Sequence, residues 1–475
     1  MKVLSDLAPQ KVWDFFELIA SIPHPSKYEK ALSDKLRQLA EDAGLSVQQD
    51  ALGNLRIDRQ ASPGFENVPL VILQGHLDMV PVSDKEFDFT TMPISLIRDG
   101  DWIRADGTTL GADDGIGVAL ILAMLFDEKL ECGPIAGLFT VAEEIGMDGA
   151  AGLDSKMLKG QYLINCDGSH NYFCVSSAGG ARQEFNFAPV RTECKAANGV
   201  KITLSGLPGG HSGCCIHDDR GNALIFLAEF LDMHPEIALS SLSGGSVDNA
   251  IPDEAVAYGA TDDDIQSLQK LADAFALLTA SSCSGAAKMK ITVEKTALPE
   301  QIFRKEFQNG FIQSIALAPN GVIEMDDNLK VVKTSSNLAA VFCKQDKIII
   351  RTSQRSMIDE CRENISNMLK EHFALFGATG RIESPYPASP PKLDSKLLKV
   401  FETVKKRAGQ PFLTGAMHAG LETGWFARKA PELEIIATGI DMVDYHTPRE
   451  RLFIPSVVEV ERFIRESLLE LARQS

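Results

Sequence analysis

The sequence predicts an α/β protein with a discontinuous main domain, built on a mixed, mainly parallel sheet with helices on both faces, and an inserted α+β domain. Between residues 50 and 185, apolar runs that end in acidic or histidine residues alternate with helical segments, as a covered parallel sheet requires. Small-residue and Pro-rich segments interrupt this pattern at 176–183 and 384–391. His446 follows the second interruption, yet the residues that we expect to share a site with it lie before residue 170.

The chain has 475 residues and a formal net charge of −18. This length exceeds what a single core usually supports, so we expect two domains of unequal size. The acidic balance argues against nucleic acid or an anionic membrane as a partner, because both favour a basic surface. The longest apolar run, 118–126, is far shorter than the roughly 20 residues that a membrane span needs.

Two features predict a cytoplasmic protein. The segment 1–16 has no apolar core and no small-residue cleavage site, so no secretory signal is expected. The nine cysteines include no CxxC pair, which fits a reducing compartment. Cys214 and Cys215 lie beside a loop that we consider functional, although two unreactive thiols are the simpler interpretation.

The elements of the main domain follow in order. Two amphipathic helices are expected before residue 50, separated by the Pro-containing turn 21–26. A helix over 115–129 begins directly after Asp113 and Asp114. Carboxylates are favourable at a helix N-terminus, so helix capping is an alternative role for one of these two residues.

Residues 186–384 read as the inserted α+β domain, which leaves 1–185 and 385–475 to form the main domain. The inserted segment combines expected strands with expected helices: strands at 200–207, 288–295 and 346–352, and helices at 221–234, 262–279 and 355–374. After the second boundary we expect a helix from Ser395, a strand over 434–440 and a last helix that Pro455 opens.

Acidic and histidine residues follow five apolar runs that we expect to be strands. In open α/β sheets, functional side chains gather at the carboxyl ends of the strands. The five runs end at His76–Asp78, Asp113–Asp114, Glu143–Glu144, Asp167 and His446. Each feature alone is usually a surface or structural one, but their joint occurrence favours a common site.

This residue set suits two metal ions about 3.5–4 Å apart that share one carboxylate. We expect His76 and Asp167 on one ion, Glu144 and His446 on the other, and Asp113 bridging them. Imidazole and carboxylate ligands without thiolate favour catalytic zinc, with manganese or cobalt as alternatives.

Two further carboxylates have expected supporting roles. Side chains at i and i+2 of an extended segment face the same side, so Asp78 can hydrogen-bond the second ring nitrogen of His76. In the pair Glu143–Glu144, one carboxylate can bind metal while the other, Glu143, stays free as a general base.

At these residues the chain resembles the co-catalytic zinc peptidases, a family that includes aminoacylases, glutamate-type carboxypeptidases and carnosinase-like dipeptidases. The likeness runs nearly end to end, and its most specific segments are GTTLGADDGIG (107–117) and AEEIGMDGA (142–150). The other matching segments are 21–26, 74–81, 163–167, GLPGGHSG (206–213), NAIP (249–252), 319–322, HAGLE (418–422) and HTPRE (446–450).

The resemblance implies a site with two zinc ions per subunit. Its metal ligands match His76, Asp113, Glu144, Asp167 and His446, with Asp113 bridging. Asp78 matches the acid that orients a ligand, and Glu143 matches the general acid/base that assists attack by a metal-bridging hydroxide. The inserted domain would be a lid that also forms a homodimer.

The resemblance also assigns residues of the lid. His211 matches a histidine that stabilises the oxyanion and, in dimeric relatives, reaches the neighbouring subunit's active site. Asn249 and Arg355 match residues that hold the substrate, with Arg355 on its terminal carboxylate. The alternatives are a turn histidine and a surface charge at a helix start. His418 and Glu422 are expected to line the substrate pocket.

The implied activity is hydrolysis of unblocked dipeptides, as in the branch of the family that accepts Xaa-His substrates such as β-Ala-His. The alternatives are an N-acyl amino acid amidohydrolase or a carboxypeptidase on the same scaffold. A metal-binding protein without catalysis is less favoured, because Glu143 is present. Two departures bear on substrate preference. Asp114 stands where relatives tend to carry Asn, and no Gly-Trp follows Tyr386-Pro387.

Overall fold

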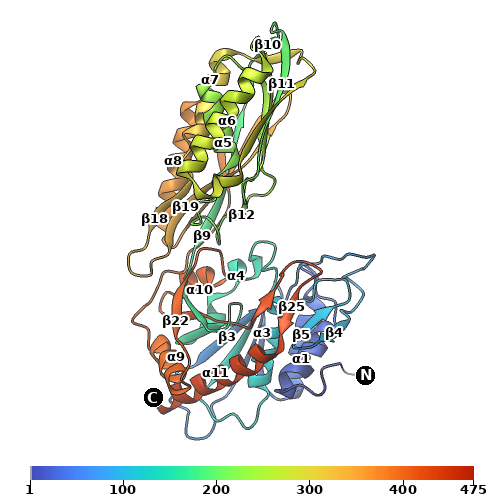
Figure 1. Cartoon of the computed structure of the whole chain (residues 1–475). Helices are drawn as coiled ribbons and strands as arrows, with labels where there is room; N and C mark the ends of the chain where they lie inside the picture. Colours follow the sequence, from blue (N-terminus) through green and yellow to red (C-terminus); the bar gives the residue numbers. More distant parts are fainter. Residues whose placement is uncertain (1–2, 475) are drawn as a thin grey trace. The chain divides into compact units, whose positions relative to one another are not determined.

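The computed structural model describes residues 3–474, which divide into two compact units (Figure 1). Unit 1 runs to Ser177 and continues as Ser389–Ala416 and from Leu421 onward. Unit 2 comprises Ala178–Ala388 and the short segment Met417–Gly420. The expected α/β class, with a discontinuous domain and an insertion, is confirmed.

The boundaries of the insertion differ from the expected 185/186 and 384/385. Strands β9 (Gly179–Phe187) and β21 (Thr379–Tyr386) pair with each other in the sheet of unit 2. The expected boundaries would cut both strands, so the units instead meet at 177/178 and 388/389. The segment that carries His418 also belongs to unit 2, rather than to the main domain as expected.

Unit 1 is built on an eight-stranded sheet with the order β1-β2-β6-β3-β7-β23-β8-β22. Its central strands β6, β3, β7 and β23 are parallel. Strands β3, β6 and β7 are buried along their whole length, which is why they read as continuous apolar runs. The strands are β1 (Ser46–Gln49), β2 (Leu55–Arg59), β3 (Val71–His76), β6 (Ile135–Thr140), β7 (Tyr162–Asn165), β8 (Tyr172–Ser177), β22 (Leu413–Met417) and β23 (Glu434–Ala437).

Helices pack on this sheet. Helix α3 contacts β3 and β6, and helix α1 packs on α3. Helix α3 is apolar on all sides, as a helix buried between other elements must be. Helix α9 contacts both β23 and α11. The helices are α1 (Gln10–Ala20), α2 (Lys30–Asp42), α3 (Ala112–Leu125), α4 (Asp148–Gly152), α9 (Lys396–Arg407), α10 (Thr423–Lys429) and α11 (Ile454–Arg473).

A small antiparallel sheet of unit 1 changes two expectations. It consists of β24 (Met442–Val443), β25 (Arg451–Phe453), β5 (Trp102–Ala105) and β4 (Leu96–Asp99), in that order. Asp113 therefore does not end a strand of the main sheet, but lies in the first turn of α3. His446 follows β24 rather than β23 directly.

Unit 2 has an antiparallel sheet with the order β16-β11-β15-β13-β19-β20-β9-β21, and β18 pairs with β19. Helices α5, α6, α7 and α8 lie along one face of it (Figure 1), where their apolar side chains share one core with the strands. The strands are β11 (Asn198–Ser205), β13 (Ala238–Gly244), β15 (Ala255–Thr261), β16 (Lys290–Thr296), β18 (Gly321–Met325), β19 (Val332–Cys343) and β20 (Ile348–Ser356). The helices are α5 (Ala223–Met233), α6 (Ile265–Ser282), α7 (Lys305–Ala316) and α8 (Asp359–Leu375).

The helix that we expected over 355–374 begins later in the structure than expected. Arg355 belongs to β20, and α8 starts only at Asp359. Strand pairing with β9 and β19 overrides the helical pattern at this end. Arg355 is thus a strand residue of the sheet, not a charge at a helix start.

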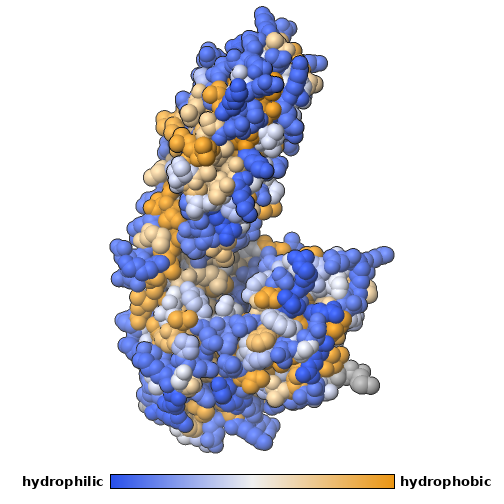
Figure 2. Space-filling model, viewed as in Figure 1, coloured by the Kyte–Doolittle hydropathy of each residue, from blue (hydrophilic) through white to orange (hydrophobic). Residues whose placement is uncertain are grey.

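One face of the molecule is drawn in Figure 2. Figure 2 shows hydrophilic side chains over most of the visible face, interrupted by smaller apolar patches. Within residues 3–474, no helix combines the length and the apolar character that crossing a bilayer requires.

Candidate metal centre and active site

His76 is the last residue of β3 and is buried. Its Nε2 lies 3.2 Å from Asp113 Oδ1, and its Nδ1 lies 3.0 Å from the carbonyl oxygen of Asp78. A carbonyl oxygen can only accept, so Nδ1 carries a proton, and Nε2 is the ring nitrogen that faces Asp113. The expected partner of this ring nitrogen, the Asp78 carboxylate, is more distant at 3.5 Å. The backbone of Asp78 therefore fixes the tautomer of His76.

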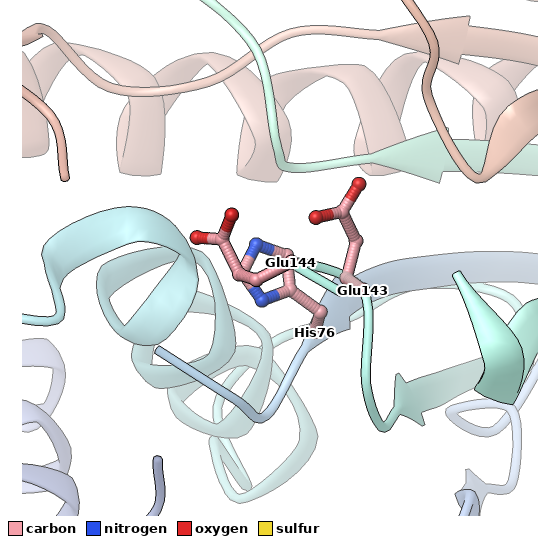
Figure 3. A group of neighbouring side chains, drawn as sticks. All are labelled: His76, Glu143 and Glu144. Carbon is pink, nitrogen blue, oxygen red and sulfur yellow. The ribbon is translucent and has the colours of Figure 1, made fainter. Parts of the chain in front are cut away.

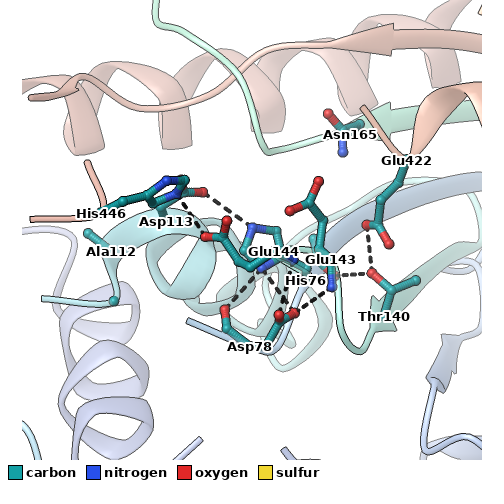
Figure 4. A network of polar contacts seen from close by, with 12 residues as sticks. His76, Asp78, Ala112, Asp113, Thr140, Glu143, Glu144, Asn165, Glu422 and His446 are labelled. Carbon is teal, nitrogen blue, oxygen red and sulfur yellow. Dashed lines mark hydrogen bonds and ion pairs between the residues drawn. The ribbon is translucent and has the colours of Figure 1, made fainter. Parts of the chain in front are cut away.

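The Asp78 carboxylate instead holds the loop after β6 (Figure 4). It accepts hydrogen bonds from the backbone N–H groups of Glu143 and Glu144, at 2.9 and 3.2 Å. The hydroxyl of Ser26 donates a third at 2.8 Å. Burial raises the pKa of Asp78, but His76 and these donors outweigh it, so the pKa lies below the usual value. Asp78 is thus an ionised residue that orders the adjacent glutamates.

Glu143 and Glu144 extend in different directions from this loop (Figure 3). Glu144 Oε1 lies 3.0 Å from His446 Nε2. The Glu143 carboxylate accepts no hydrogen bond within the described residues. Burial raises the pKa of Glu143 well above its usual value. One glutamate is therefore tied to the cluster, whereas the carboxylate of the other has no hydrogen-bond partner among the described residues.

Asp113 lies between the two histidines. Its Oδ1 faces His76 Nε2 at 3.2 Å, and its Oδ2 faces His446 Nε2 at 3.3 Å. Burial raises the pKa of Asp113, but contacts with His446 and His76 lower it well below the usual range overall. The two oxygens of one carboxylate thus face separate nitrogen donors.

Asp167 completes the cluster from the position two residues after β7. Burial, followed by the nearby charge of Asp113, raises the pKa of Asp167 to about 7. Three residue groups have potential ligand atoms within 4.8 Å of one another. They are His76, Asp113 and Asp167; Asp113, Glu144 and His446; and His76, Glu143 and Glu144.

The charge balance of this cluster fits divalent cations. No Lys or Arg of the described chain forms an ion pair with these carboxylates, and only the two histidines contact them. Several buried carboxylates cannot all stay ionised without positive charge nearby. Nitrogen and oxygen donors without a thiolate are the ligands that zinc prefers at catalytic sites.

Glu450 supports the site and was missed in the sequence. Its carboxylate accepts hydrogen bonds from the N–H groups of Leu110 at 2.8 Å and Ala112 at 2.9 Å, with longer ones from Gly111 and Asp113. It thereby satisfies the orphan N–H groups at the start of α3. The only sequence signal is its place in HTPRE, because its partners lie some 340 positions away.

Asp114 is fully buried, and neither carboxylate oxygen has a hydrogen-bond partner among residues 3–474. A Cβ at Gly75 or Gly117 would lie 2.3 or 2.2 Å from these oxygens, so the two glycines make room for the carboxyl group. Burial raises the pKa of Asp114 well above its usual value. Burial thus favours the neutral form of Asp114 over the charged form that the sequence suggested beside the bridging carboxylate.

Glu422, expected to line the substrate pocket, is buried in unit 1. It is fully buried, and its Oε2 accepts hydrogen bonds from Gln74 and Thr140, both at 2.7 Å. Gln74 in turn accepts one from Asn165 at 2.6 Å. Burial raises the pKa of Glu422 to about 7. Glu422 therefore belongs to a polar network across β6, β3 and β7.

The remaining candidates lie in unit 2. His211 Nδ1 accepts hydrogen bonds from the backbone N–H groups of Gly213 at 3.2 Å and Cys214 at 3.3 Å. Burial, with a smaller effect from Arg355, lowers the pKa of His211 to about 4. His211 is thus neutral at pH 7, with its proton on Nε2. Asn249 is near, because its carbonyl oxygen accepts a hydrogen bond from Ser212.

Arg355 and His418 belong to the same neighbourhood of unit 2. Arg355 is only 7% exposed and forms no ion pair within the described chain. Its one recorded hydrogen bond runs from Nη1 to Tyr386 Oη at 3.0 Å. His418 Nε2 lies 2.7 Å from Ser335 Oγ, and burial, with the charge of Arg355, lowers the pKa of His418 to about 3.

The chain is similar to known proteins over nearly its whole length. Residues 72–470 match the model of Peptidase family M20/M25/M40. The chain is 36% identical over 482 aligned residues to the cytosol non-specific dipeptidase of Escherichia coli, with 99% of each chain covered. It is also 27% identical over 178 residues to the uncharacterized protein YqjE of Bacillus subtilis, covering 34% of this chain and 45% of that protein.

Solved structures extend the likeness. The aminoacylhistidine dipeptidase from Vibrio alginolyticus superposes with a TM-score of 0.90 at 35% identity, covering 98% of this chain and 97% of that one. The aminopeptidase PepT from Bacillus cereus shares the fold with a TM-score of 0.58 at 15% identity, covering 98% and 99%. From the extent of the family match and the identity to a full-length relative, this chain belongs to Peptidase family M20/M25/M40.

Proposed function

We propose that this chain is a metal-dependent dipeptidase that hydrolyses unblocked dipeptides, with unit 1 as its catalytic domain and unit 2 as its lid. One observation carries the proposal: Asp113 is common to two ligand groups, one with His76 and Asp167 and the other with Glu144 and His446. This is the arrangement that two metal ions with a shared carboxylate require.

We propose two Zn²⁺ ions per chain at these groups, with Mn²⁺ or Co²⁺ as substitutes. Bound there, the ions would act as Lewis acids that polarise a substrate carbonyl and favour ionisation of water. The chain's own residues supply the remaining steps.

Glu143 is the proposed general acid/base. Its backbone is held by Asp78, while its carboxylate remains unbonded. Its raised pKa suits a group that takes a proton from the attacking water and then delivers it to the leaving amine. A carboxylate already engaged in hydrogen bonds would have to lose them first.

His211 is the proposed donor to the oxyanion. His211 Nδ1 accepts hydrogen bonds from two backbone N–H groups, so the ring proton lies on Nε2. The neutral ring therefore presents a hydrogen-bond donor at Nε2. Such a donor, fixed before the reaction, stabilises negative charge that develops on the carbonyl oxygen. Gly213 allows this arrangement, since a Cβ there would lie 2.9 Å from the His211 ring.

Arg355 is the proposed receptor for the terminal carboxylate of the substrate, with Asn249 and His418 as further substrate contacts. A buried cation without an ion-pair partner is costly, and a carboxylate ligand would reduce this cost. A guanidinium can bind a carboxylate through two parallel hydrogen bonds. Dipeptides with a free carboxylate therefore fit better than blocked ones. The two full-length relatives are named as dipeptidases, which supports this substrate class.

The proposed substrates and place of action follow the names of the same relatives. We propose Xaa-His dipeptides such as β-Ala-His among the substrates, in line with the aminoacylhistidine dipeptidase. The cytosol named for the Escherichia coli relative supports a cytoplasmic enzyme. A homodimer through unit 2 remains part of the proposal.

A panel of substrates tests this function. Zinc-loaded protein is incubated with β-Ala-His, Ala-His, Gly-Gly and N-acetyl-Ala, beside the variant Glu143→Ala. Cleavage of the free dipeptides that disappears in the variant supports a dipeptidase. Cleavage of N-acetyl-Ala alone would instead identify an amidohydrolase, and no turnover at all would reject the proposed substrate class.

A further inference from the structure

The side chain that holds Arg355 is neutral. Tyr386 Oη accepts the 3.0 Å hydrogen bond from Arg355 Nη1, and Arg355 Nε has no partner within residues 3–474. A carboxylate in the place of Tyr386 would pair with the guanidinium and weaken its attraction for an anion. A phenol can orient the guanidinium and leave its positive charge available.

Strand register brings these two residues together. Ser335 on β19 stands opposite Arg355 on β20, Arg355 stands opposite Gly180 on β9, and Gly180 stands opposite Tyr386 on β21. The four residues therefore form one row across four adjacent strands. Arg355 and Tyr386 are separated by one strand, and only Gly180 lies between them.

Gly180 is what lets Tyr386 reach Arg355. A Cβ at position 180 would lie 2.3 Å from both Cζ and Oη of Tyr386. The tyrosine ring thus occupies the space where a side chain of β9 would otherwise stand. Any larger residue at Gly180 would displace the hydroxyl group from Arg355.

Two features fix the backbone around Tyr386. The pairing of β21 with β9 shifts register between Glu383 and Tyr386, and a bulge of this kind re-aims a side chain. Arg362 on α8 is buried and donates hydrogen bonds to the carbonyl oxygens of Gly180 and Tyr386. One helix residue therefore fixes the backbone of two members of the row, Gly180 and Tyr386.

We propose that Tyr386 is a positioning residue that orients the Arg355 guanidinium for the terminal carboxylate of the substrate. The inference rests on the proposed function, because it assigns a carboxylate ligand to Arg355. It makes Tyr386 a determinant of specificity for free over blocked carboxyl termini.

Ligand binding to a protein that cannot turn over tests the inference. Zinc-loaded Glu143→Gln protein is titrated calorimetrically with Ala-His and with the C-terminal amide of Ala-His. The same titrations are repeated with the double variant that carries both Glu143→Gln and Tyr386→Phe. Phe cannot hold the guanidinium in place, so we expect the Kd for Ala-His to rise about tenfold, which corresponds to about 1.4 kcal/mol. The Kd for the amide, which lacks the carboxylate, should stay within about twofold of its starting value.

Controls separate positioning from a structural role. Tyr258→Phe makes the same change at a half-exposed position of the same sheet and should alter neither Kd. Gly180→Ala should reproduce the selective loss for Ala-His, because its Cβ displaces the Tyr386 ring. In otherwise unchanged enzyme, Tyr386→Phe should raise KM for Ala-His with kcat nearly constant.

Three results would overturn the inference. Equal weakening of Ala-His and the amide would make Tyr386 structural, and an unchanged Kd for both would remove it from carboxylate binding. In either case, cleavage of dipeptides by the unchanged enzyme would leave the proposed function intact. Absence of that cleavage would reject the proposed function, and the inference with it.

Discussion

The Asp78 carboxylate accepts a hydrogen bond from the backbone N–H of Glu143 at 2.9 Å. This bond links the end of β3, which carries His76, to the loop after β6, which carries the proposed base. Because the neighbouring N–H of Glu144 binds the other oxygen, a single side chain sets the geometry of both glutamates. The order of the metal site and the position of the base thus depend on the same residue.

Asp78→Asn should weaken metal binding and slow catalysis together. The amide nitrogen of Asn would face an N–H group where an oxygen now accepts, so the loop would shift. Loss of such supporting contacts commonly lowers metal affinity about 10–100-fold. Titration of zinc-free protein in metal buffers measures the affinity, with the exposed Asp84→Asn as control. Unchanged affinity in Asp78→Asn would contradict this account.

Glu450→Gln should destabilise unit 1. The substitution replaces one acceptor oxygen by a donor that faces the N–H groups at the start of α3. A buried donor left without a partner costs about 1–3 kcal/mol, and the free energy of unfolding should fall by this amount. Urea unfolding without metal measures it. The exposed Glu432→Gln is the matched control, and an equal effect of both variants would refute the proposed role of Glu450.

Unit 2 should lose stability as the pH falls. Burial and Arg355 hold the pKa of His418 at about 3 and that of His211 at about 4, both below the ordinary value of 6.5. The unfolded chain therefore binds protons that the folded chain excludes, so stability is full above pH 6.5 and declines toward pH 3–4.

His418→Gln removes one of these groups and should flatten the decline. Unfolding free energies from pH 7.5 to pH 4.5 for the variant and the unchanged protein provide the test. The two curves should converge at the acidic end. Parallel curves would contradict this prediction, because they would show that the pKa of His418 is the same in the folded and the unfolded chain.

Mixed subunits should reveal which residues serve one active site. His211 and Arg355 lie in the same unit of one chain, and the charge of Arg355 affects the pKa of His211. Each active site should therefore receive both from a single chain, whether its own or a partner's. Mixing His211→Asn with Arg355→Lys should give only the mean activity of the two variants.

Recovery above that mean would contradict the expectation, because it would show that one site draws the two residues from different chains. A companion mixture of Glu143→Ala with His211→Asn asks whether the lid acts in trans. Recovery there would support the dimer proposed from the relatives. Its absence would place the lid over its own catalytic domain.

The sequence predicted the parallel core well, because β3, β6 and β7 are buried on both sides and read as continuous apolar runs. It also predicted that His76, Glu144 and Asp167 lie near one another, since the parallel strands β3, β6 and β7 bring their carboxyl ends to one edge. Asp113 and His446 join them from α3 and from the segment after β24, which strand order alone does not predict. It misplaced Arg355 on a helix, because the helical pattern of α8 extends into β20 and only pairing with β9 decides the outcome.

Contacts between distant segments could not be predicted. Glu450 binds the start of α3, and Glu422 binds Gln74, through side chains separated by some 340 positions. The local pattern of apolar and polar residues indicates that these carboxylates lie next to apolar segments of the sequence. It does not identify their distant hydrogen-bond partners. The link between Tyr386 and Arg355 likewise depends on register and on the missing side chain of Gly180.

The measurement that tests the central claim most directly is the metal content and turnover of Glu143→Gln beside the unchanged protein. Elemental analysis after zinc loading should find two ions per chain in both, because Glu143 is not one of the five proposed ligands. Removal of a general base commonly costs about 10²–10⁴-fold in rate, so kcat on Ala-His should fall by this amount in the variant. Loss of metal from the variant, or turnover that persists with both ions bound, would contradict the assignment of Glu143 as the base.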